Sequence, residues 1–142
     1  MNPSADPHGL KRFVDAQEPV YQEVLEELRA GKKRSHWIWF IFPQIAGLGS
    51  SPTAQRYAIA SIDEALAYLG HPILGARLRE CTAIVNQIEG RTVSEIFGWP
   101  DDMKFRSCMT LFAQATTENQ VFRDALEKYF SGEADQQTLR RI

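Results

Sequence analysis

Helix start and stop signals recur along this 142-residue chain and limit its fold more than any other feature. Capping residues or prolines precede segments with apolar residues at helical spacing, and glycines follow most of these segments. Between Pro19 and Ala30, for example, Tyr21, Val24 and Leu28 fall on one helical face. The other expected helices run from Asp6 to the residues before Pro19, from Ser51 to Gly70, from His71 to Gly90, from Thr92 to Gly98, from Asp101 or Asp102 through Phe112, from Thr117 to Gly132, and from Asp135 to Ile142.

Paired hydroxyl and carboxylate or amide side chains mark two of these helix starts. Thr92 and Glu95 form a capping box, in which each side chain satisfies a free backbone amide of the first turn. Residues 117–120 show the same pattern, and Asp135 can cap the last helix. No comparable set of alternating strands, repeat or low-complexity segment interrupts the pattern. The sequence therefore predicts an all-α fold, a multi-helix bundle with one domain over residues 1–142.

The apolar segment WIWFIF at residues 37–42 is the exception, because β-propensity alone would make it a strand. A single strand in a helical chain would have no partner. A short helix that is apolar on every side can instead run through the middle of a bundle. We therefore expect a central, short, aromatic-rich helix at this position.

Composition excludes several classes of protein. Hydrophobic residues make up 44% of the chain and aromatic residues 11%, which is too many for a disordered chain. The net charge of −2 provides no general field for polyanions, so no nucleic-acid partner is expected. The longest apolar run is far shorter than the roughly 20 residues that cross a bilayer, and the polar N-terminus does not resemble a signal peptide. We expect a cytoplasmic protein with no membrane partner.

The cysteines and carboxylates show no catalytic or metal-binding arrangement. Cys81 and Cys108 lie within apolar helical patterns, so we expect buried, reduced thiols. Together with three scattered histidines they give no zinc spacing. Asp101 and Asp102 are adjacent, which does not favour a facing acid–base pair. No metal and no cofactor are therefore expected, and the oligomeric state is left open.

The first candidate site is the basic stretch KRSH at residues 33–36, which leads straight into the aromatic segment. If Ser35 is the N-cap, His36 and Trp37 occupy a first helical turn, where backbone amides and the helix dipole favour an anion. A neutral imidazole at His36 would then suit a general base or acid. The alternative is a structural histidine that donates a hydrogen bond to a backbone carbonyl. Lys33 adds a local cation suited to a small anion.

Trp37 and Trp39 lie two residues apart on the expected helix, so their side chains point to different sides. One can pack in the core while the other lines a cavity and stacks on a flat ligand, although either also fits the core. The amide of Gln44 needs a partner, which can be a backbone group or a ligand. The flexible loop at residues 47–52, which includes Ser51, lies just before a helix start, a geometry that suits phosphate or plain helix capping.

A second candidate set lies on the helix that begins near Asp102. Lys104, Ser107 and Thr110 step by three along one side of this helix. The cation of Lys104 near a helix start opposes the dipole, so an ion pair with an aspartate or an anionic ligand must offset it. The stripe is either solvated surface or, if it faces the His36 segment, a cation and two hydroxyls suited to phosphate or ribose.

The chain also carries a family resemblance. It rests on the segments LKRFVDAQ (10–17), LRAGKKRSHWIWFIFPQIAGLGSS (28–51), YAIASIDEALAYLGHPILGARL (57–78), IFGWPDDMKFRSCMTLF (96–112) and FSGEADQQTLRRI (130–142). These segments resemble a bacterial all-α family of unknown function whose members are often labelled calpastatin. That label does not fit, because calpain inhibitors of that name resemble disordered chains, whereas this one has the periodicity of a packed bundle. The resemblance implies an all-α fold and signature positions rather than an activity, with a loose link to NAD or ADP-ribose.

The signature positions that the resemblance implies are Lys33, Ser35, His36, Trp37, Trp39, Pro43, Gln44, Gly47, Gly49, Ser51, His71, Arg77, Asp102, Lys104, Ser107 and Thr110.

These candidates lead to one functional hypothesis and a rival. The first is a protein that binds or processes a small anionic, nucleotide-like ligand, for example one of the NAD or ADP-ribose type, with His36 as the catalytic residue if chemistry occurs. The expected ligand-binding residues are Lys33, Ser35, Trp37, Trp39, Gln44, Ser51, Asp102, Lys104, Ser107 and Thr110. The rival is a non-catalytic binding or regulatory module whose signature residues serve the fold. The first hypothesis requires His36 and Lys104 to face one hollow walled by indole.

Overall fold

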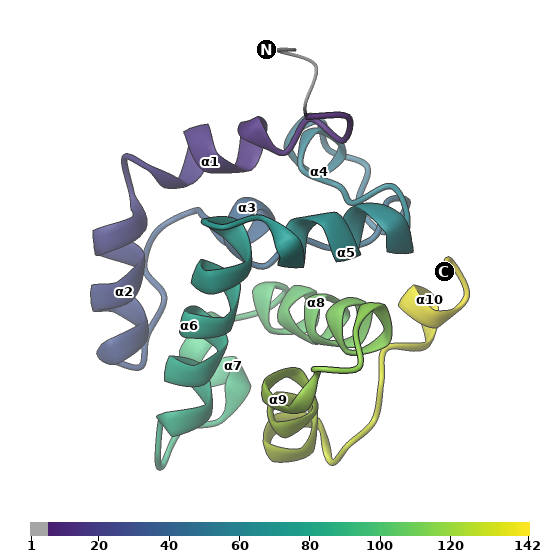
Figure 1. The fold of residues 1–142 in the computed structure, drawn as a ribbon. Helices are drawn as coiled ribbons and strands as arrows, with labels where there is room; N and C mark the ends of the chain where they lie inside the picture. Colours follow the sequence, from purple (N-terminus) through teal and green to yellow (C-terminus); the bar gives the residue numbers. More distant parts are fainter. Residues whose placement is uncertain (1–5) are drawn as a thin grey trace.

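The structure, a computed structural model, describes residues 6–142. Residues 1–5, part of the polar segment that we distinguished from a signal peptide, lie outside the described residues. The described chain is helical throughout its core (Figure 1). Its helices are α1 (Lys11–Gln17), α2 (Tyr21–Arg29), α3 (Ile38–Ile41), α4 (Pro52–Arg56), α5 (Ile62–Gly70), α6 (Leu74–Gln87), α7 (Val93–Phe97), α8 (Asp101–Ala115), α9 (Gln120–Phe130) and α10 (Gln136–Leu139). The predicted all-α fold is confirmed.

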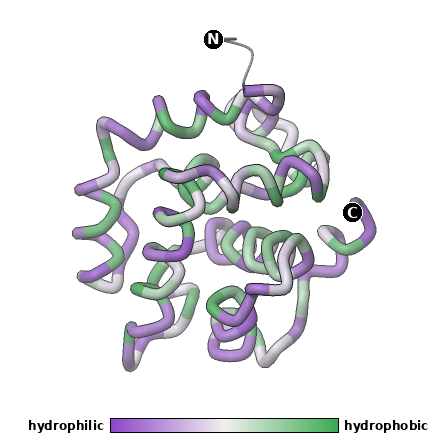
Figure 2. Tube along the Cα trace, in the orientation of Figure 1, coloured by the Kyte–Doolittle hydropathy of each residue, from purple (hydrophilic) through white to green (hydrophobic). Residues whose placement is uncertain are grey.

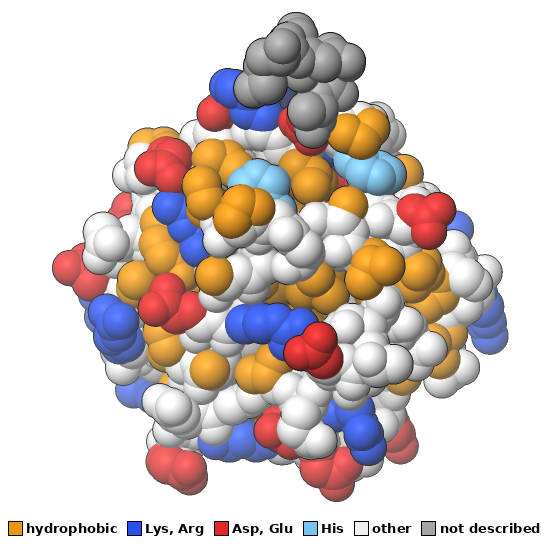
Figure 3. Space-filling model, in the orientation of Figure 1, with side chains coloured by type: hydrophobic (Ala, Val, Ile, Leu, Met, Phe, Trp, Pro, Cys, Tyr) orange, Lys and Arg blue, Asp and Glu red, His pale blue; other side chains and the backbone are white. Residues whose placement is uncertain are grey.

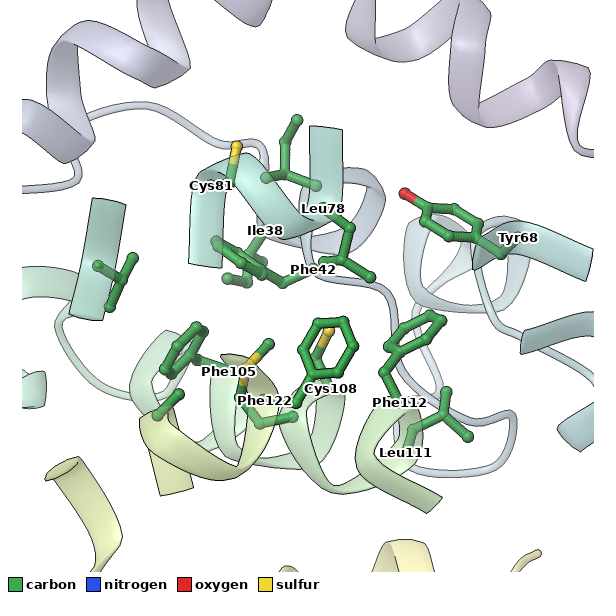
Figure 4. Close-up of a cluster of buried hydrophobic side chains, with 14 of the residues drawn as sticks. Ile38, Phe42, Tyr68, Leu78, Cys81, Phe105, Cys108, Leu111, Phe112 and Phe122 are labelled. Atoms are coloured by element: carbon green, nitrogen blue, oxygen red, sulfur yellow. The ribbon is translucent and has the colours of Figure 1, made fainter. Parts of the chain in front are cut away.

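Helix α8 forms the centre of the molecule and packs against α3, α5, α7, α9 and α10. Its length and its apolar residues explain this position, because few of its side chains face solvent. Figure 4 shows how Phe105 and Phe112 of α8 meet side chains of the surrounding helices. The Phe112 ring lies 5.5 Å from that of Tyr68 and 5.9 Å from that of Phe122. Tight aromatic packing of this kind stabilises the core beyond simple burial.

The outer helices are buried on one side only. Figure 2 shows hydrophilic and hydrophobic residues alternating along α2 and α9, as expected of amphipathic helices at the surface. On α2, Val24 and Leu28 are fully buried, whereas Glu23 and Glu26 are exposed.

The face drawn in Figure 3 carries acidic and basic side chains close together. Within residues 6–142, no helix is both long and apolar enough to cross a membrane.

The aromatic segment is helical, as predicted, but the helix is limited to the four residues Ile38–Ile41. Trp37 and Phe42 flank it, and both are buried. The Phe42 ring packs edge-on against Phe105 of α8 at 5.0 Å, which places α3 beside the central helix. The apolar run therefore passes through the interior.

The expected helix over residues 51–70 is wrong in one respect, because it is two helices, α4 and α5. The residues between them include Ile59, which forms an isolated β-bridge with Ile45. The Ala46 amide donates to the Ile59 carbonyl and the Ile59 amide to the Gln44 carbonyl, each at 2.8 Å. Ser61 then caps α5 by accepting from the Glu64 amide. Ser61 and Glu64 have the spacing of a capping box, a signal for this second start that our prediction did not use, although the Glu64 carboxylate accepts from the Ala60 amide rather than from Ser61.

Some of the expected caps are confirmed and others are wrong. The Thr92–Glu95 capping box at α7 and the Asp135 cap of α10 are present. The box expected at residues 117–120 is absent, and Asn119 precedes α9 without a side-chain cap bond. Neither Asp101 nor Asp102 is an N-cap, because Pro100 precedes α8 and both aspartates lie in its first turn.

Both cysteines are buried free thiols, as predicted. Burial raises the pKa of the Cys81 thiol to about 12, and burial raises the pKa of Cys108 well above its ordinary value. Both side chains therefore stay protonated and act as small apolar residues.

Candidate functional site

The buried carboxylate of Glu27 on α2 holds the basic stretch at residues 33–36 in place. Its Oε1 accepts from the backbone amides of Arg34, at 2.6 Å, and Ser35, at 3.0 Å. The Ser35 hydroxyl donates to Oε2 at 2.7 Å, and the Trp37 indole N–H donates to Oε1 at 3.0 Å. These bonds lower the pKa of Glu27, although burial opposes them by disfavouring the charged form. The Glu27 carboxylate is thus a negatively charged acceptor, supplied by the protein itself, for the polar groups of this stretch.

These contacts correct two expectations for the stretch. Ser35 is not a helix N-cap, because α3 begins at Ile38 and the serine hydroxyl is bound to Glu27. Trp37 is 1% exposed, and its N–H is used by the same carboxylate. Both side chains therefore serve the fold, and neither lines the hollow that Lys104 lines.

Lys33 is also used within the fold. Its side chain is only 6% exposed, and its ammonium lies 2.7 Å from Asp101 Oδ2, donates to the Ser35 carbonyl, and sits 5.0 Å from the centre of the Trp37 ring. The other oxygen of Asp101 lies 3.6 Å from the Lys104 ammonium. Asp101 thus links the two lysines, and its charge is balanced mainly by the closer one, Lys33. Lys104 is left with the weaker pairing.

Several of the predicted site residues meet in one hollow, which we call the Lys104 hollow. Its volume is about 460 Å³. Among its lining residues are Trp39, Gln44, Ser51, Lys104 and Ser107, all of which the sequence analysis selected. They come from α3, the loop after it and α8, segments far apart in the sequence that the α3–α8 packing brings together.

The polar groups of the Lys104 hollow are incompletely satisfied. Trp39 is half-buried, and the Lys104 ammonium lies 5.1 Å from the centre of its ring, a cation–π contact. Within residues 6–142, neither the Trp39 indole N–H nor the side-chain amide of Gln44 has a hydrogen-bond partner, and neither group is sealed from solvent. The backbone partner that we considered for the Gln44 amide is therefore not found in this part of the chain. These groups can bind a ligand without breaking an internal bond.

The three residues of the predicted stripe on α8 do not all lie in the same environment. Lys104 and Ser107 line the hollow, whereas Thr110 is buried, donates to the Arg106 carbonyl and accepts from the Asp135 amide at 2.8 Å. Asp102 is buried and accepts from the Met103 amide. Thr110 and Asp102 do not line the hollow, so the expectation that they take part in this site is not met.

His36 does not join this group either. The residue is exposed, in the bend before α3, and it is not among the residues that line the Lys104 hollow. The arrangement required above, with His36 and Lys104 facing one hollow, is therefore not met. The catalytic role predicted for His36 has no support from the geometry of this site.

A second, smaller hollow, which no sequence motif predicted, lies beside the first. We call it the Tyr57 hollow. Its volume is about 160 Å³, and it shares Trp39, Gln44, Leu48 and two further small residues with the Lys104 hollow. Tyr57 lines only this second hollow, where its ring packs 5.4 Å from that of Phe40. No motif pointed to Tyr57, because its place depends on the turn of the chain at the Ile45–Ile59 bridge.

Two carboxylates at or beside the site, Asp101 and Asp135, were not predicted as site residues, although an ion pair between Lys104 and an aspartate was expected and is present. Asp101 links Lys33 to Lys104, and Asp135 lines the Lys104 hollow. Asp135 Oδ2 accepts from the Ser107 hydroxyl at 3.0 Å and from the Thr138 amide at 3.1 Å. Within residues 6–142, no three His, Cys, Asp or Glu side chains gather as metal ligands would.

The fold and site define an all-α protein with a polar, indole-walled hollow, and the comparisons place it in a family. Residues 7–142 match the model of a family described as a protein of unknown function (DUF1810), and the chain belongs to this family. It is similar to the crystal structure of the conserved hypothetical protein Rv1873 from Mycobacterium tuberculosis. The identity is 61% over 95% of this chain and 96% of that chain, with a TM-score of 0.95. No curated protein matches the chain significantly.

Proposed function

We propose that the Lys104 hollow binds a small anionic, nucleotide-like molecule. The observation that carries this proposal is the set of available polar groups around one indole: the Lys104 ammonium, the Gln44 amide and the Trp39 N–H. An ammonium held beside an aromatic ring attracts an anion, while the ring offers a flat surface for stacking.

The surrounding groups favour a ligand that also carries hydroxyls. Ser51 and Ser107 each have a hydroxyl at the hollow, and the carboxylate of Asp135 can accept from a sugar hydroxyl. Asp135 would repel a second acidic group placed beside it, whereas Lys104 would attract one. A phosphorylated sugar or nucleotide with one end acidic and the other hydroxylated suits this pair of charges. NAD and ADP-ribose belong to the same chemical class and to the panel that tests it.

The test is a thermal-shift screen with inorganic phosphate, ribose 5-phosphate, nucleoside monophosphates, NAD and ADP-ribose. A ligand at 100 times its dissociation constant should raise the free energy of unfolding by roughly 2.7 kcal/mol. Lys104→Gln should remove the response because it removes the cation, whereas Lys11→Gln, at an exposed lysine of α1, should retain it. No response from any member of the panel, or an unchanged response in Lys104→Gln, would refute the proposal.

The rival function, a non-catalytic module that docks a partner protein, also has one observation in its favour. Trp99, in the turn before α8, is 80% exposed, and Met103, in the first turn of α8, is 42% exposed. A contiguous patch of large exposed apolar side chains is typical of an interaction surface. Trp99→Ser would weaken partner binding and leave the small-molecule response intact, which separates the two functions.

A further inference from the structure

The Tyr57 hollow differs from the Lys104 hollow in its chemistry. Among residues 6–142, no charged side chain lines it. Its walls are the rings of Trp39 and Tyr57 and the aliphatic side chains of Ile45 and Leu48. The volume of about 160 Å³ is close to that of an engineered cavity of about 150 Å³ that binds benzene. The hollow thus fits one uncharged ring.

The polar groups at the wall of this hollow suit a heteroaromatic ring. The Gln44 amide carries a donor and an acceptor, and the Tyr57 hydroxyl, like that amide, has no hydrogen-bond partner within residues 6–142. The Gln55 amide donates to the Ser50 carbonyl at 3.1 Å, which leaves its own carbonyl oxygen available. An amide can pair with the edge of a heterocycle, whereas a benzene ring would leave these groups unbound.

The backbone around the Tyr57 hollow is fixed, so the hollow exists before a ligand arrives. The two hydrogen bonds at the Ile45–Ile59 bridge, each 2.8 Å long, hold the chain at Gln44 and Ala46. The Tyr57 ring is packed on Phe40 and also lies 5.8 Å from Phe13. Gly47 takes φ +97°, and a side chain there would meet the Arg141 guanidinium, so only glycine fits this turn. A preformed pocket binds with little ordering cost.

Trp39 and Gln44 line both hollows, so a single molecule can occupy the two together. We propose that the ligand of this protein has two parts: one uncharged heteroaromatic ring in the Tyr57 hollow and an anionic group at Lys104. Pyrimidine nucleoside monophosphates are members of this class. The inference rests on the proposed function and adds the identity of the second part, together with a preference for a single ring over a purine, because the Tyr57 hollow is the smaller of the two.

The experiment titrates the full chain with uridine 5′-monophosphate, adenosine 5′-monophosphate, ribose 5-phosphate and uridine, by calorimetry and by the indole N–H signals in NMR spectra. Uridine 5′-monophosphate should bind about tenfold tighter than ribose 5-phosphate, because the base adds stacking on an aromatic side chain. The affinity of adenosine 5′-monophosphate should exceed that of ribose 5-phosphate by much less. Equal affinity of the two nucleotides, or no gain from the uracil ring, would overturn the inference while ribose 5-phosphate binding still supports the anion site.

Variants separate the two parts of the site. Ala46→Leu adds volume at a wall that only the Tyr57 hollow uses, so it should abolish the tenfold gain and leave ribose 5-phosphate binding unchanged. Ala76→Leu, at an exposed position of α6, is the matched control and should change neither the tenfold gain from the uracil ring nor the binding of ribose 5-phosphate. Circular dichroism verifies the fold of each variant, and Tyr57→Phe, which keeps the ring packing, serves if Ala46→Leu unfolds. Binding of uridine without any contribution from phosphate would overturn both proposals.

Discussion

The two halves of the segment from Lys33 to Ser51 look equally unusual in sequence but differ in how their polar groups are satisfied. In the first half, Lys33, Ser35 and Trp37 are all bound to carboxylates of the protein itself. In the second half, Trp39 and Gln44 line hollows with their polar groups available. The same kinds of side chain therefore stabilise the fold on one side of Ile38 and form a candidate site on the other.

The two halves differ in whether their polar side chains already have hydrogen-bond partners within the protein. Those with partners serve the fold, and those without are candidates for binding a ligand. A buried polar group bound on all sides stabilises the fold, and removing its partner is costly. A half-buried group without a partner contributes little to folding and can bind a ligand at little cost. The experiments below test each half, beginning with the residue that holds the first.

Glu27→Ala should have the largest effect, because it leaves the amides of Arg34 and Ser35 and the Trp37 N–H without their acceptor. We expect a loss of about 3 kcal/mol or more in the free energy of unfolding, measured by urea denaturation. Glu26→Ala, at an exposed position of the same helix, is the matched control and should stay within about 0.5 kcal/mol of the parent. A small loss in the free energy of unfolding for Glu27→Ala would mean that the hydrogen bonds to Glu27 of α2 do not stabilise the first half of the segment.

Acid should weaken the same contacts. The pKa of Glu27 is lowered by its hydrogen bonds from its ordinary value of 4.5, even though burial opposes this shift. Its contribution to stability is therefore complete above about pH 4.5, and it is lost as the pH falls towards the pKa of the folded state. Unfolding experiments from pH 7 to pH 3 should show this decline, and Glu27→Gln should reduce it. An equally steep decline in Glu27→Gln would assign the acid sensitivity to other carboxylates.

The sequence was informative about local features and about the two tryptophans. Their spacing allowed one to pack in the core while the other lines a cavity, and the structure shows Trp37 and Trp39 in these positions, so only one of the two expected ligand-binding tryptophans lines a hollow. The capping box at Thr92 was equally readable, because both its partners lie within one helical turn. Such features depend only on neighbours in the chain.

The features that could not be predicted depend on tertiary contacts. Glu27 looked like one more acidic residue of an amphipathic helix, and its partners lie seven to ten residues further along the chain. The Ile45–Ile59 bridge, which ends α4 and shapes the Tyr57 hollow, joins two segments on either side of that helix. For His36 the aromatic neighbours suggested a pocket, but the pocket formed around Trp39, on the far side of Trp37 in sequence.

Replacing each tryptophan by phenylalanine compares the two halves directly. Trp37→Phe removes the bond to Glu27 and part of the core packing, so we expect a loss of about 2 kcal/mol in the free energy of unfolding. Trp39→Phe should lose less than about 1 kcal/mol, because its side chain is half-buried and its N–H has no partner within residues 6–142. Ligand response should follow the opposite order, with the Trp39 variant the weaker binder. Equal losses of stability in the two variants would contradict the distinction between a structural first half and a ligand-binding second half of the segment.

His36→Ala should have the smallest effect, since the residue is exposed and does not line the Lys104 hollow. We expect a free energy of unfolding within about 0.5 kcal/mol of the parent and an unchanged thermal shift with ribose 5-phosphate. Lys104→Gln, measured in parallel, should lose that shift. If His36→Ala instead lost the ligand response while keeping the fold, the imidazole would take part in binding. The candidate site would then extend across Trp37 into the first half of the segment, and the catalytic role predicted for His36 would regain its basis.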